Sequence, residues 1–330
     1  MLKVAMLSKW HVHADMYADS LKKLDNVKIT AVWDEDALRG EKWASELNAD
    51  FEKDLDTLLK RQDVDCVVVC APTSMHKEVI VAAAQAGKHI FTEKAMALTK
   101  KECEIISKAV KDSGVKFCIS FPYRTNGTYI YAKNVIDSGL IGNITLLRVG
   151  NGHDGALNNW LPDYWYDEKT AGGGAMMDLG CHPMYITSWI LGKPKRISSI
   201  FNYYTGKAVE DNAVCSIEFE NKAIAIVESS LVSVRKMNIF EAYGTLGSLI
   251  ISGSRVKLTS KKMDPDFDGW LSPLKLPESL PLPIYQWIDA IENDKPVLYG
   301  TEDGTKLTEL LEGAYISHRE NKVFEYQSGS

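Results

Sequence analysis

An aspartate and a histidine four residues apart, Asp178 and His182, are the side chains of this sequence best suited to proton transfer. The residues from Ala175 to Leu191 are apolar at helical spacing, which predicts a helix in which positions four apart share one face. A carboxylate beside an imidazole fixes the tautomer of the ring and stabilises its charged form, as general acid–base chemistry requires. The same spacing fits a buried pair that only anchors the helix. The spacing alone therefore does not distinguish a catalytic pair from a structural one, and other motifs of the chain are needed.

Three consecutive glycines, Gly172 to Gly174, directly precede this predicted helix. Because glycine has no Cβ, such a stretch can turn tightly and lets a ligand approach the backbone closely. The preceding segment, residues 151–171, is rich in Trp, Tyr, Asn and Asp and is predicted to be a long loop. We expect this loop to contribute to substrate specificity.

A second group of chemically interesting residues follows two strand-like segments in the first half of the chain. The run Cys66–Cys70 leads into Ala71, Pro72, Thr73 and His76, and the segment His89–Thr92 leads into Glu93 and Lys94. Open α/β sheets bind ligands at the carboxyl ends of their parallel strands. Lys94 therefore has a chemical role if an anionic or polarisable group binds at this edge. Without such a group, its sequence context is equally that of an ordinary surface lysine.

Strand-like and helical segments alternate over the first 120 residues or so, which is typical of a parallel α/β sheet. The strand-like segments are 3–7, 27–33, 66–70, 89–92 and 116–121, and the helical ones are 12–24, 37–47, 55–61, 75–86 and 100–112. This order predicts a doubly wound, dinucleotide-binding Rossmann domain over residues 1–122.

Beyond Pro122 the strands follow one another with the short gaps of hairpins. We expect strands at 144–149, 197–204, 213–220, 223–231, 237–243, 248–251 and 256–259, and helices at 129–138, 175–191, 284–292 and 305–320. Residues 123–330 are thus predicted to form an α+β domain with a mainly antiparallel sheet and helices, which would bind the substrate.

Composition narrows the function classes further. The formal net charge of −6 over 330 residues argues against a nucleic-acid partner, because phosphates attract a basic face. No apolar run reaches the ~18 residues that a membrane helix needs, and the first residues run directly into a strand pattern rather than a secretory signal. The six cysteines form no Cys-x-x-Cys pair. We expect a reduced, cytoplasmic protein without a membrane partner.

The turn after the first strand lacks the glycines through which Rossmann domains normally bind a pyrophosphate. It reads Ser8-Lys9-Trp10-His11, and we expect the backbone N–H groups of Trp10 and His11 to contact the diphosphate beside the small Ser8. Asp34 ends the second strand, where an acidic side chain accepts hydrogen bonds from the adenosine ribose. Asp34 fits equally well as the cap of the helix that starts at Ala37.

Taken together, the motifs resemble the Gfo/Idh/MocA family of NAD(P)-dependent oxidoreductases over nearly the whole chain. The resemblance is carried by Ala71-Pro72-Thr73 with His76, Ala86-Gly87-Lys88-His89 before Glu93-Lys94, Gly172–Gly174 with Asp178 and His182, Tyr243–Gly247, and Trp287–Ile291 with Glu302-Asp303-Gly304. In that family, the lysine of a Glu-Lys-Pro motif and an Asp-x-x-x-His pair form the catalytic group. These positions are Lys94, Asp178 and His182 here, and Ala95 replaces the proline.

The resemblance implies a dehydrogenase that transfers hydride between a hydroxyl of a sugar, cyclitol or related polyol and a nicotinamide. His182 would take the hydroxyl proton, Asp178 would hold its tautomer and Lys94 would stabilise the alkoxide. NAD is expected rather than NADP because Asp34 would repel a 2′-phosphate, although Arg39 could soften that preference. The alternatives are an NAD-assisted glycoside hydrolase on the same scaffold and a non-catalytic sugar or nucleotide sensor.

The remaining site predictions complete this hypothesis. Substrate contacts are expected from Arg124, Trp165 and Tyr185, although Arg124 fits a surface arginine and Tyr185 fits a helix–sheet interface as well. His11 and His13 are residues of a type that binds metals, but a metal site needs a third or fourth ligand. His76 is the only candidate for that ligand in the sequence, so we expect no metal. A homodimer or homotetramer is implied by the family resemblance. The residues expected to bind the cofactor are Ser8, Trp10, His11, Asp34, Ala71, Pro72, Thr73, His76, Glu93 and Lys94.

Overall fold

The computed structural model describes residues 1–253, 255–266 and 268–327 and divides into two compact units. Unit 1 consists of Met1–Ser120 and Pro281–Thr308, and unit 2 consists of Phe121–Leu280 and the chain from Glu309 onward. The segment Pro281–Thr308 thus belongs to unit 1, whereas the sequence placed it in the second domain. The last three residues of that predicted domain, 328–330, lie outside the described residues.

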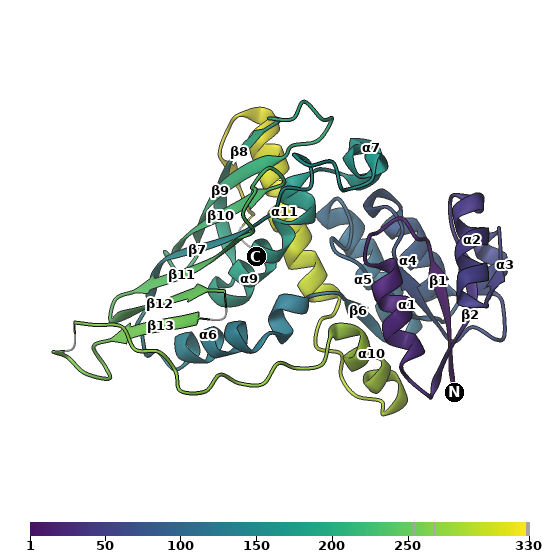
Figure 1. Cartoon of the computed structure of the whole chain (residues 1–330), viewed down its shortest axis with the longest axis horizontal. Helices are drawn as coiled ribbons and strands as arrows, with labels where there is room; N and C mark the ends of the chain where they lie inside the picture. Colours follow the sequence, from purple (N-terminus) through teal and green to yellow (C-terminus); the bar gives the residue numbers. More distant parts are fainter. Residues whose placement is uncertain (254, 267, 328–330) are drawn as a thin grey trace. The chain divides into compact units, whose positions relative to one another are not determined.

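Unit 1 is built on a sheet of six parallel strands in the order β3-β2-β1-β4-β5-β6 (Figure 1). This is the strand order of dinucleotide-binding Rossmann domains, so the predicted fold class is confirmed. The strand β3 has two residues and was not predicted, because so short a segment carries no periodicity. The strands are β1 (Leu2–Leu7), β2 (Val27–Trp33), β3 (Asp50–Phe51), β4 (Cys66–Val69), β5 (His89–Thr92) and β6 (Phe117–Ile119).

The helices of unit 1 have clear local start and stop signals. Asp36 caps the second helix, and Thr99 forms a capping box with Glu102 before a helix that ends at Gly114, whose φ is 69°. The four residues of β4 are all buried, as expected for a strand covered on both faces. The helices are α1 (Ala14–Lys22), α2 (Ala37–Leu47), α3 (Leu55–Leu59), α4 (His76–Gln85), α5 (Lys100–Ser113) and α10 (Pro283–Glu292).

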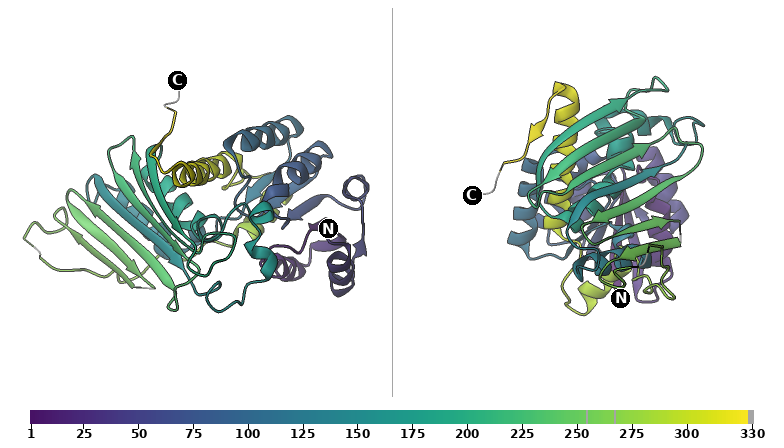
Figure 2. Two further views of the ribbon diagram at one scale, coloured as in Figure 1. Left: turned by 90° about the horizontal axis from the view of Figure 1, so that it is seen from above. Right: turned by 90° about the vertical axis from the view of Figure 1, so that its left-hand side faces the viewer.

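Unit 2 is built on an eight-stranded sheet in the order β13-β12-β11-β7-β10-β9-β8-β14 (Figure 2). Most neighbours are antiparallel, as predicted, but β10 pairs with β7 in parallel, so the sheet is mixed. The strands are β7 (Ile144–Gly152), β8 (Pro194–Asn202), β9 (Asn212–Phe219), β10 (Ile224–Ser230), β11 (Met237–Gly244), β12 (Gly247–Ser252), β13 (Arg255–Ser260) and β14 (Phe324–Glu325).

The predicted single helix over 175–191 is two helices in the structure, which corrects the sequence expectation. The break falls at Leu179 and Gly180, so Asp178 ends α8 (Ala175–Asp178) and His182 lies in the first turn of α9 (Cys181–Leu191). Both helices pack against strands of the unit 2 sheet, and its other face carries the exposed residues of the alternating pattern on β8 and β9. The further helices are α6 (Gly127–Asp137), α7 (Glu168–Ala171) and α11 (Thr301–Glu320).

Among the described residues, no helix is both long enough and apolar enough to span a membrane.

Candidate functional site

The glycine-poor turn after β1 depends on Ser8, whose φ of 71° is the left-handed conformation that glycine normally supplies. The Ser8 N–H donates to the carbonyl of Trp33 at 2.6 Å, and its Oγ accepts the N–H of Trp10 at 3.0 Å. The N–H of His11 donates to the carbonyl of Cys70 at 3.0 Å. The two N–H groups that the sequence assigned to the diphosphate thus have acceptors within the protein.

Asp34, at the end of β2, is completely buried and holds Arg39. Its carboxylate accepts the N–H groups of Lys9 and Asp36 at 2.8 and 2.9 Å, and it accepts Nη2 and Nε of Arg39 at 2.6 and 3.0 Å. Arg39 also pairs with Glu35 at 2.5 Å. Because Asp36 caps α2, the alternative that Asp34 is the helix cap is wrong. Asp34, Glu35 and Asp36 place three carboxylates in this turn against the one guanidinium of Arg39, which leaves the turn negative.

Although burial disfavours the charged guanidinium, the bonds to Asp34 and the charges of Asp34 and Glu35 raise the pKa of Arg39. The arginine therefore remains protonated and committed to these two carboxylates. Because Arg39 already pairs with two carboxylates, its presence near the end of β2 does not by itself indicate a site for a 2′-phosphate.

We expect Asp34→Asn to shift cofactor selectivity toward NADPH. The substitution removes one negative charge and weakens the hold on Arg39, so the ratio of the Kd for NADPH to that for NADH should fall about tenfold, or 1.4 kcal/mol. Fluorescence titration with both cofactors measures this ratio. Asp36→Asn is the matched control, since it removes the same charge nearby while asparagine still caps α2. Equal shifts in the two variants would contradict the assignment.

His76 is a structural clamp between two strand ends. Its ring is buried in unit 1, with Nδ1 2.8 Å from the carbonyl oxygen of Ala95 and Nε2 3.0 Å from that of Ala71. Burial lowers the pKa of His76, while the two carbonyls favour an added proton, and a neutral ring can donate to only one of them. His76, expected at the cofactor, thus ties the segment after Lys94 to the end of β4.

Glu93 is the centre of a buried network that reaches the backbone of Lys94. Its Oε1 accepts the hydroxyl of Tyr17 and lies 2.9 Å from Nδ1 of His13, and its Oε2 accepts the N–H of Lys94 at 3.1 Å. Tyr17 also contacts the hydroxyl of Ser120 at 2.8 Å. The sequence did not single out Tyr17, although it lies in α1 four residues after His13, the residue that precedes this helix.

Burial alone would raise the pKa of Glu93, but the charges of His11 and His13, the hydrogen bond from His13 and the charge of Lys94 hold it well below its usual range. Glu93 is therefore an anion that fixes the main chain at Lys94. The Lys94 side chain is itself 5% exposed, so it is not the ordinary surface lysine of the alternative interpretation.

His11, His13 and Glu93 bring potential metal-ligand atoms within 4.8 Å of one another. The sequence considered His76 as the third partner of the two histidines, and Glu93 takes that place in the structure. Nδ1 of His11 accepts a hydrogen bond from the backbone N–H of His13 at 3.2 Å. The Glu93 oxygens accept hydrogen bonds from the hydroxyl of Tyr17 and the backbone N–H of Lys94. These contacts form a hydrogen-bonded network, and the expectation of a metal-free protein stays a prediction.

In unit 2 two of the three glycines before α8 pack closely against the protein itself. A Cβ on Gly174 would lie 2.0 Å from the carbonyl oxygen of Glu210, and one on Gly173 would lie 1.9 Å from the hydroxyl of Tyr315. Gly172 ends α7 with a φ of 79°. The sequence predicted close approach at this stretch but attributed it to a ligand.

Glu210 holds the start of α8, the helix that ends at Asp178. Its Oε2 accepts the N–H of Gly174 at 2.9 Å, and its Oε1 accepts the N–H of Met176 at 2.9 Å and the hydroxyl of Tyr315 at 2.6 Å. Burial raises the pKa of Glu210 despite these donors. No local pattern pointed to Glu210, because its partners lie more than thirty residues away in the sequence.

We expect Glu210→Gln to destabilise unit 2 by about 2 kcal/mol, because the side-chain NH₂ would face an N–H donor and leave a buried donor unsatisfied. Urea unfolding measures the loss. Glu218→Gln provides the control, since Glu218 pairs with Lys195 and Arg196 at the surface, where ion pairs contribute little. Equal unfolding midpoints for the two variants would show that Glu210 does not hold α8.

The two residues of the predicted acid–base pair have different neighbours within unit 2. Oδ2 of Asp178 accepts the indole N–H of Trp165 at 3.3 Å, and Trp165 is buried. Nδ1 of His182 lies 3.0 Å from the hydroxyl of Tyr185, and the ring of Tyr123 stacks on His182 at 4.5 Å. Trp165 and Tyr185, expected at the substrate, are thus neighbours of the proposed catalytic side chains.

Arg124, the third residue expected at the substrate, lies with its guanidinium carbon 5.2 Å from the centre of the Trp189 ring. Lys133 approaches the same ring at 5.7 Å. Cations favour the face of an indole, so this arrangement orders Arg124 within unit 2.

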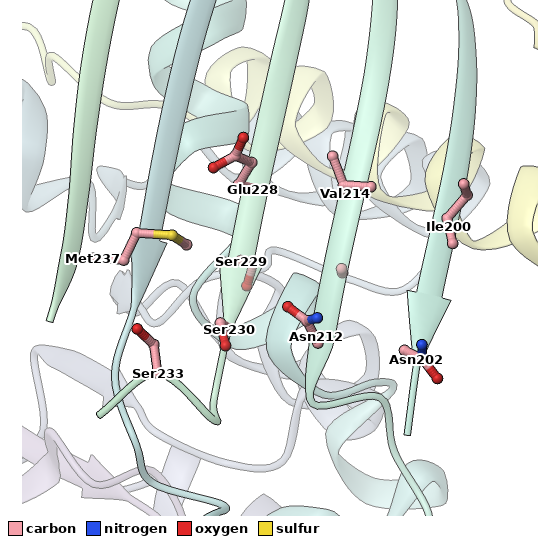
Figure 3. Close-up of a pocket in the computed structure, with 10 residues that line it drawn as sticks. Ile200, Asn202, Asn212, Val214, Glu228, Ser229, Ser230, Ser233 and Met237 are labelled. Carbon is pink, nitrogen blue, oxygen red and sulfur yellow. The ribbon is translucent and has the colours of Figure 1, made fainter. Parts of the chain in front are cut away.

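A depression with a volume of about 340 Å³ lies on the sheet of unit 2 (Figure 3). None of its lining residues belongs to α8 or α9. Its lining comes from adjacent strands and includes none of the residues predicted to act on cofactor or substrate. The lining residues are Ile200, Asn202, Asn212, Ala213, Val214, Glu228, Ser229, Ser230, Ser233 and Met237.

Comparison with known proteins agrees with this architecture. Residues 10–121 match the model of an oxidoreductase family with an NAD-binding Rossmann fold, and residues 129–250 match the model of the GFO/IDH/MocA C-terminal domain. The scyllo-inositol 2-dehydrogenase (NAD(+)) of Bacillus subtilis is 28% identical over 298 residues, which are 84% of this chain and 82% of that protein.

Two further relatives extend the comparison. The uncharacterized oxidoreductase YrbE of Bacillus subtilis is 27% identical over 252 residues, covering 73% of this chain and 71% of YrbE. The structure of a levoglucosan dehydrogenase in complex with NADH has the same fold, with a TM-score of 0.86 and 20% identity over 99% of this chain and 100% of that one. The chain therefore belongs to the Gfo/Idh/MocA family of oxidoreductases, whose N-terminal domain is an NAD-binding Rossmann fold.

Proposed function

We propose that this protein is an NAD-dependent dehydrogenase that acts on a secondary alcohol of a sugar, cyclitol or related polyol. The observation that carries the proposal is that Lys94 and His182 are buried and held by defined neighbours, on a fold that belongs to an NAD-binding oxidoreductase family. A protein that only binds a ligand gains nothing from an amine and an imidazole placed in this way, which disfavours the sensor alternative.

The residues of unit 1 fit a dinucleotide. The strand order is that of Rossmann domains, and acidic side chains stand at the end of β2, where ribose hydroxyls are bound in such folds. Asp34, which also holds Arg39, is proposed to recognise the adenosine ribose from this position at the end of β2. The other residues that would hold NAD are Ser8, Trp10, His11, Ala71, Pro72, Thr73, His76, Glu93 and Lys94.

Bound NAD supplies the hydride acceptor, and the protein supplies orientation and proton handling. Lys94, Asp178 and His182 are proposed to act on the reacting hydroxyl, by accepting its proton and stabilising the developing alkoxide. Glu93 positions Lys94 through its backbone, and Trp165 and Tyr185 position Asp178 and His182. Arg124 is proposed to contact the substrate from its place over Trp189.

Polyol substrates are supported by the names of the relatives, which include an inositol dehydrogenase and a levoglucosan dehydrogenase. A ring with several hydroxyls offers hydrogen-bond donors and acceptors. Residues 151–171 can bind such groups, because this segment carries Asp154, Asn158 and Trp160 at exposed or partly exposed positions.

The quaternary state is proposed to be a homodimer or homotetramer, and the location to be the cytoplasm. Support for association comes from the open face of the unit 2 sheet, where Ile200, Ile224 and Val214 are 68%, 48% and 38% exposed. Exposed apolar side chains that cluster on one face mark interaction sites. The cytoplasm is supported by six buried cysteines that are all reduced.

The test is a screen of polyols and sugars with NAD, read by NADH absorbance. Accumulation of NADH with one of these substrates is the expected result. Cleavage of a glycoside without net NADH would replace the proposal by NAD-assisted hydrolysis. Tight binding of a sugar without any turnover would replace it by the sensor.

A further inference from the structure

The hydroxyl of Tyr185 has two polar neighbours among the described residues, and they constrain where its hydrogen lies. The oxygen accepts the backbone N–H of Tyr123 at 3.0 Å and lies 3.0 Å from Nδ1 of His182. The Tyr185 side chain is buried and its ring stacks on Phe121 at 4.1 Å, so water does not replace either neighbour. A backbone N–H can only donate, so the contact with Tyr123 uses a lone pair of the phenol oxygen.

The hydrogen of the Tyr185 hydroxyl therefore has one acceptor available among these neighbours, which is Nδ1 of His182. If Nδ1 carried a hydrogen instead, the phenol oxygen would accept two bonds, and its own buried hydrogen would be left without an acceptor. Burial raises the pKa of Tyr185 well above its ordinary value, so the phenol keeps its hydrogen near neutral pH.

The orientation of the imidazole is fixed at the same time. Tyr123 stacks on the His182 ring with an angle of 18° between the planes, and Tyr129 in turn stacks on Tyr123, also at 18°. Rotation of the ring would break the stack as well as the contact with Tyr185. The sequence assigned the tautomer of His182 to Asp178, whereas in the structure Nδ1 of His182 faces the hydroxyl of Tyr185.

We propose that Tyr185 is a positioning residue that donates to Nδ1 of His182 and so places the hydrogen of the neutral imidazole on Nε2. His182 then acts on the substrate oxygen as a hydrogen-bond donor and stabilises the alkoxide, rather than as the proton acceptor. This consequence rests on the proposed dehydrogenase function. Bound NAD would supply the acceptor for the hydride as the alcohol becomes a ketone. The hydroxyl proton would pass to the Lys94 amine, which would first have to release its own proton to solvent.

The tautomer can be measured without any substrate, by NMR of protein labelled with ¹⁵N in its histidine rings, at a pH where the ring is neutral. The signals of His182 are assigned as those that His182→Gln removes. We expect an unprotonated Nδ1 and a protonated Nε2 in the wild-type protein. A protonated Nδ1 would overturn the proposal, whatever the outcome of the polyol screen.

Tyr185→Phe tests the cause of this preference, because it removes the donor and keeps the ring that stacks on Phe121. We expect the two nitrogens to move toward averaged shifts, and kcat to fall about tenfold with the Kd for NADH unchanged, since one hydrogen bond is lost. Tyr129→Phe removes the hydroxyl of a ring that contacts His182 only through Tyr123, and it should leave the tautomer of His182 as in the wild type. An unchanged tautomer in Tyr185→Phe would also overturn the proposal.

Discussion

Replacement of His182 by alanine is expected to lower kcat for polyol oxidation by a factor of about 10² to 10³, the range for removal of a donor that stabilises a developing oxyanion. The Kd for NADH should change little, because the interaction is made with the reacting oxygen rather than with the cofactor. Stopped-flow or steady-state NADH absorbance gives kcat, and fluorescence titration gives the Kd.

The control is His318→Ala, which removes another imidazole of unit 2. His318 packs on Phe201 and accepts its N–H, and it belongs to no predicted site. Near wild-type turnover is expected for this variant. If His182→Ala also oxidised a known substrate at close to the wild-type rate, the catalytic role of His182 would be rejected.

Trp287→Ala is expected to destabilise unit 1 by about 3–5 kcal/mol, as is usual for the loss of a large buried aromatic side chain. Trp287 lies on α10 and is fully buried, its ring is 5.7 Å from that of Phe91 on β5, and its indole N–H donates to the carbonyl of Lys116 at 3.3 Å. Truncation removes the packing and leaves that carbonyl without this donor. Guanidinium unfolding followed by circular dichroism measures the loss.

Trp270→Ala is the matched control, since Trp270 is a tryptophan of the described chain that is 46% exposed. Its removal should change stability by only a few tenths of a kcal/mol. A similar loss in both variants would mean that α10 contributes no more to the core of unit 1 than a surface tryptophan does.

Apart from the two-residue strand β3, the strands and helices of unit 1 could be predicted from the sequence because each has a local signal. The buried run at β4 and the capped helix α5 are examples, and their bounds in the structure lie within a residue or two of those expected. The membership of α10 could not be predicted, because an apolar helix face does not say which sheet it covers. Its partner became visible only in the contact of Trp287 with Phe91.

The break between α8 and α9 had a local signal that the expectation of one helix did not use. Gly180 and Pro183 both disfavour a helix interior, by about 1 and about 3 kcal/mol, and in the structure Pro183 lies in the first turn of α9, where proline is tolerated. Tertiary contacts decide the outcome, since Glu210 holds the first N–H groups of α8. The acid–base pair is thus positioned by two short helices with separate supports.

The candidate site was predictable in its residue types and less so in their roles. Lys94, Asp178 and His182 stand out by motif. In the structure His76, Trp165 and Tyr185 contact carbonyls or other side chains, and their expected contacts with ligands stay predictions. Sequence spacing reports which residues share an element. It does not report which atom of a ring meets which neighbour, and that detail determines the tautomer of His182.

The inclusion of Pro281–Thr308 in unit 1 has a consequence for how the chain folds during synthesis. The ribosome makes Met1–Ser120 first, and α10 follows only after the intervening 160 residues of unit 2. At translation rates of about 5–20 residues per second, the nascent Rossmann sheet waits roughly ten to thirty seconds for the helix that covers Phe91. During that interval the uncovered apolar surface is a natural target for chaperones, and a fragment ending at Ser120 would retain it permanently.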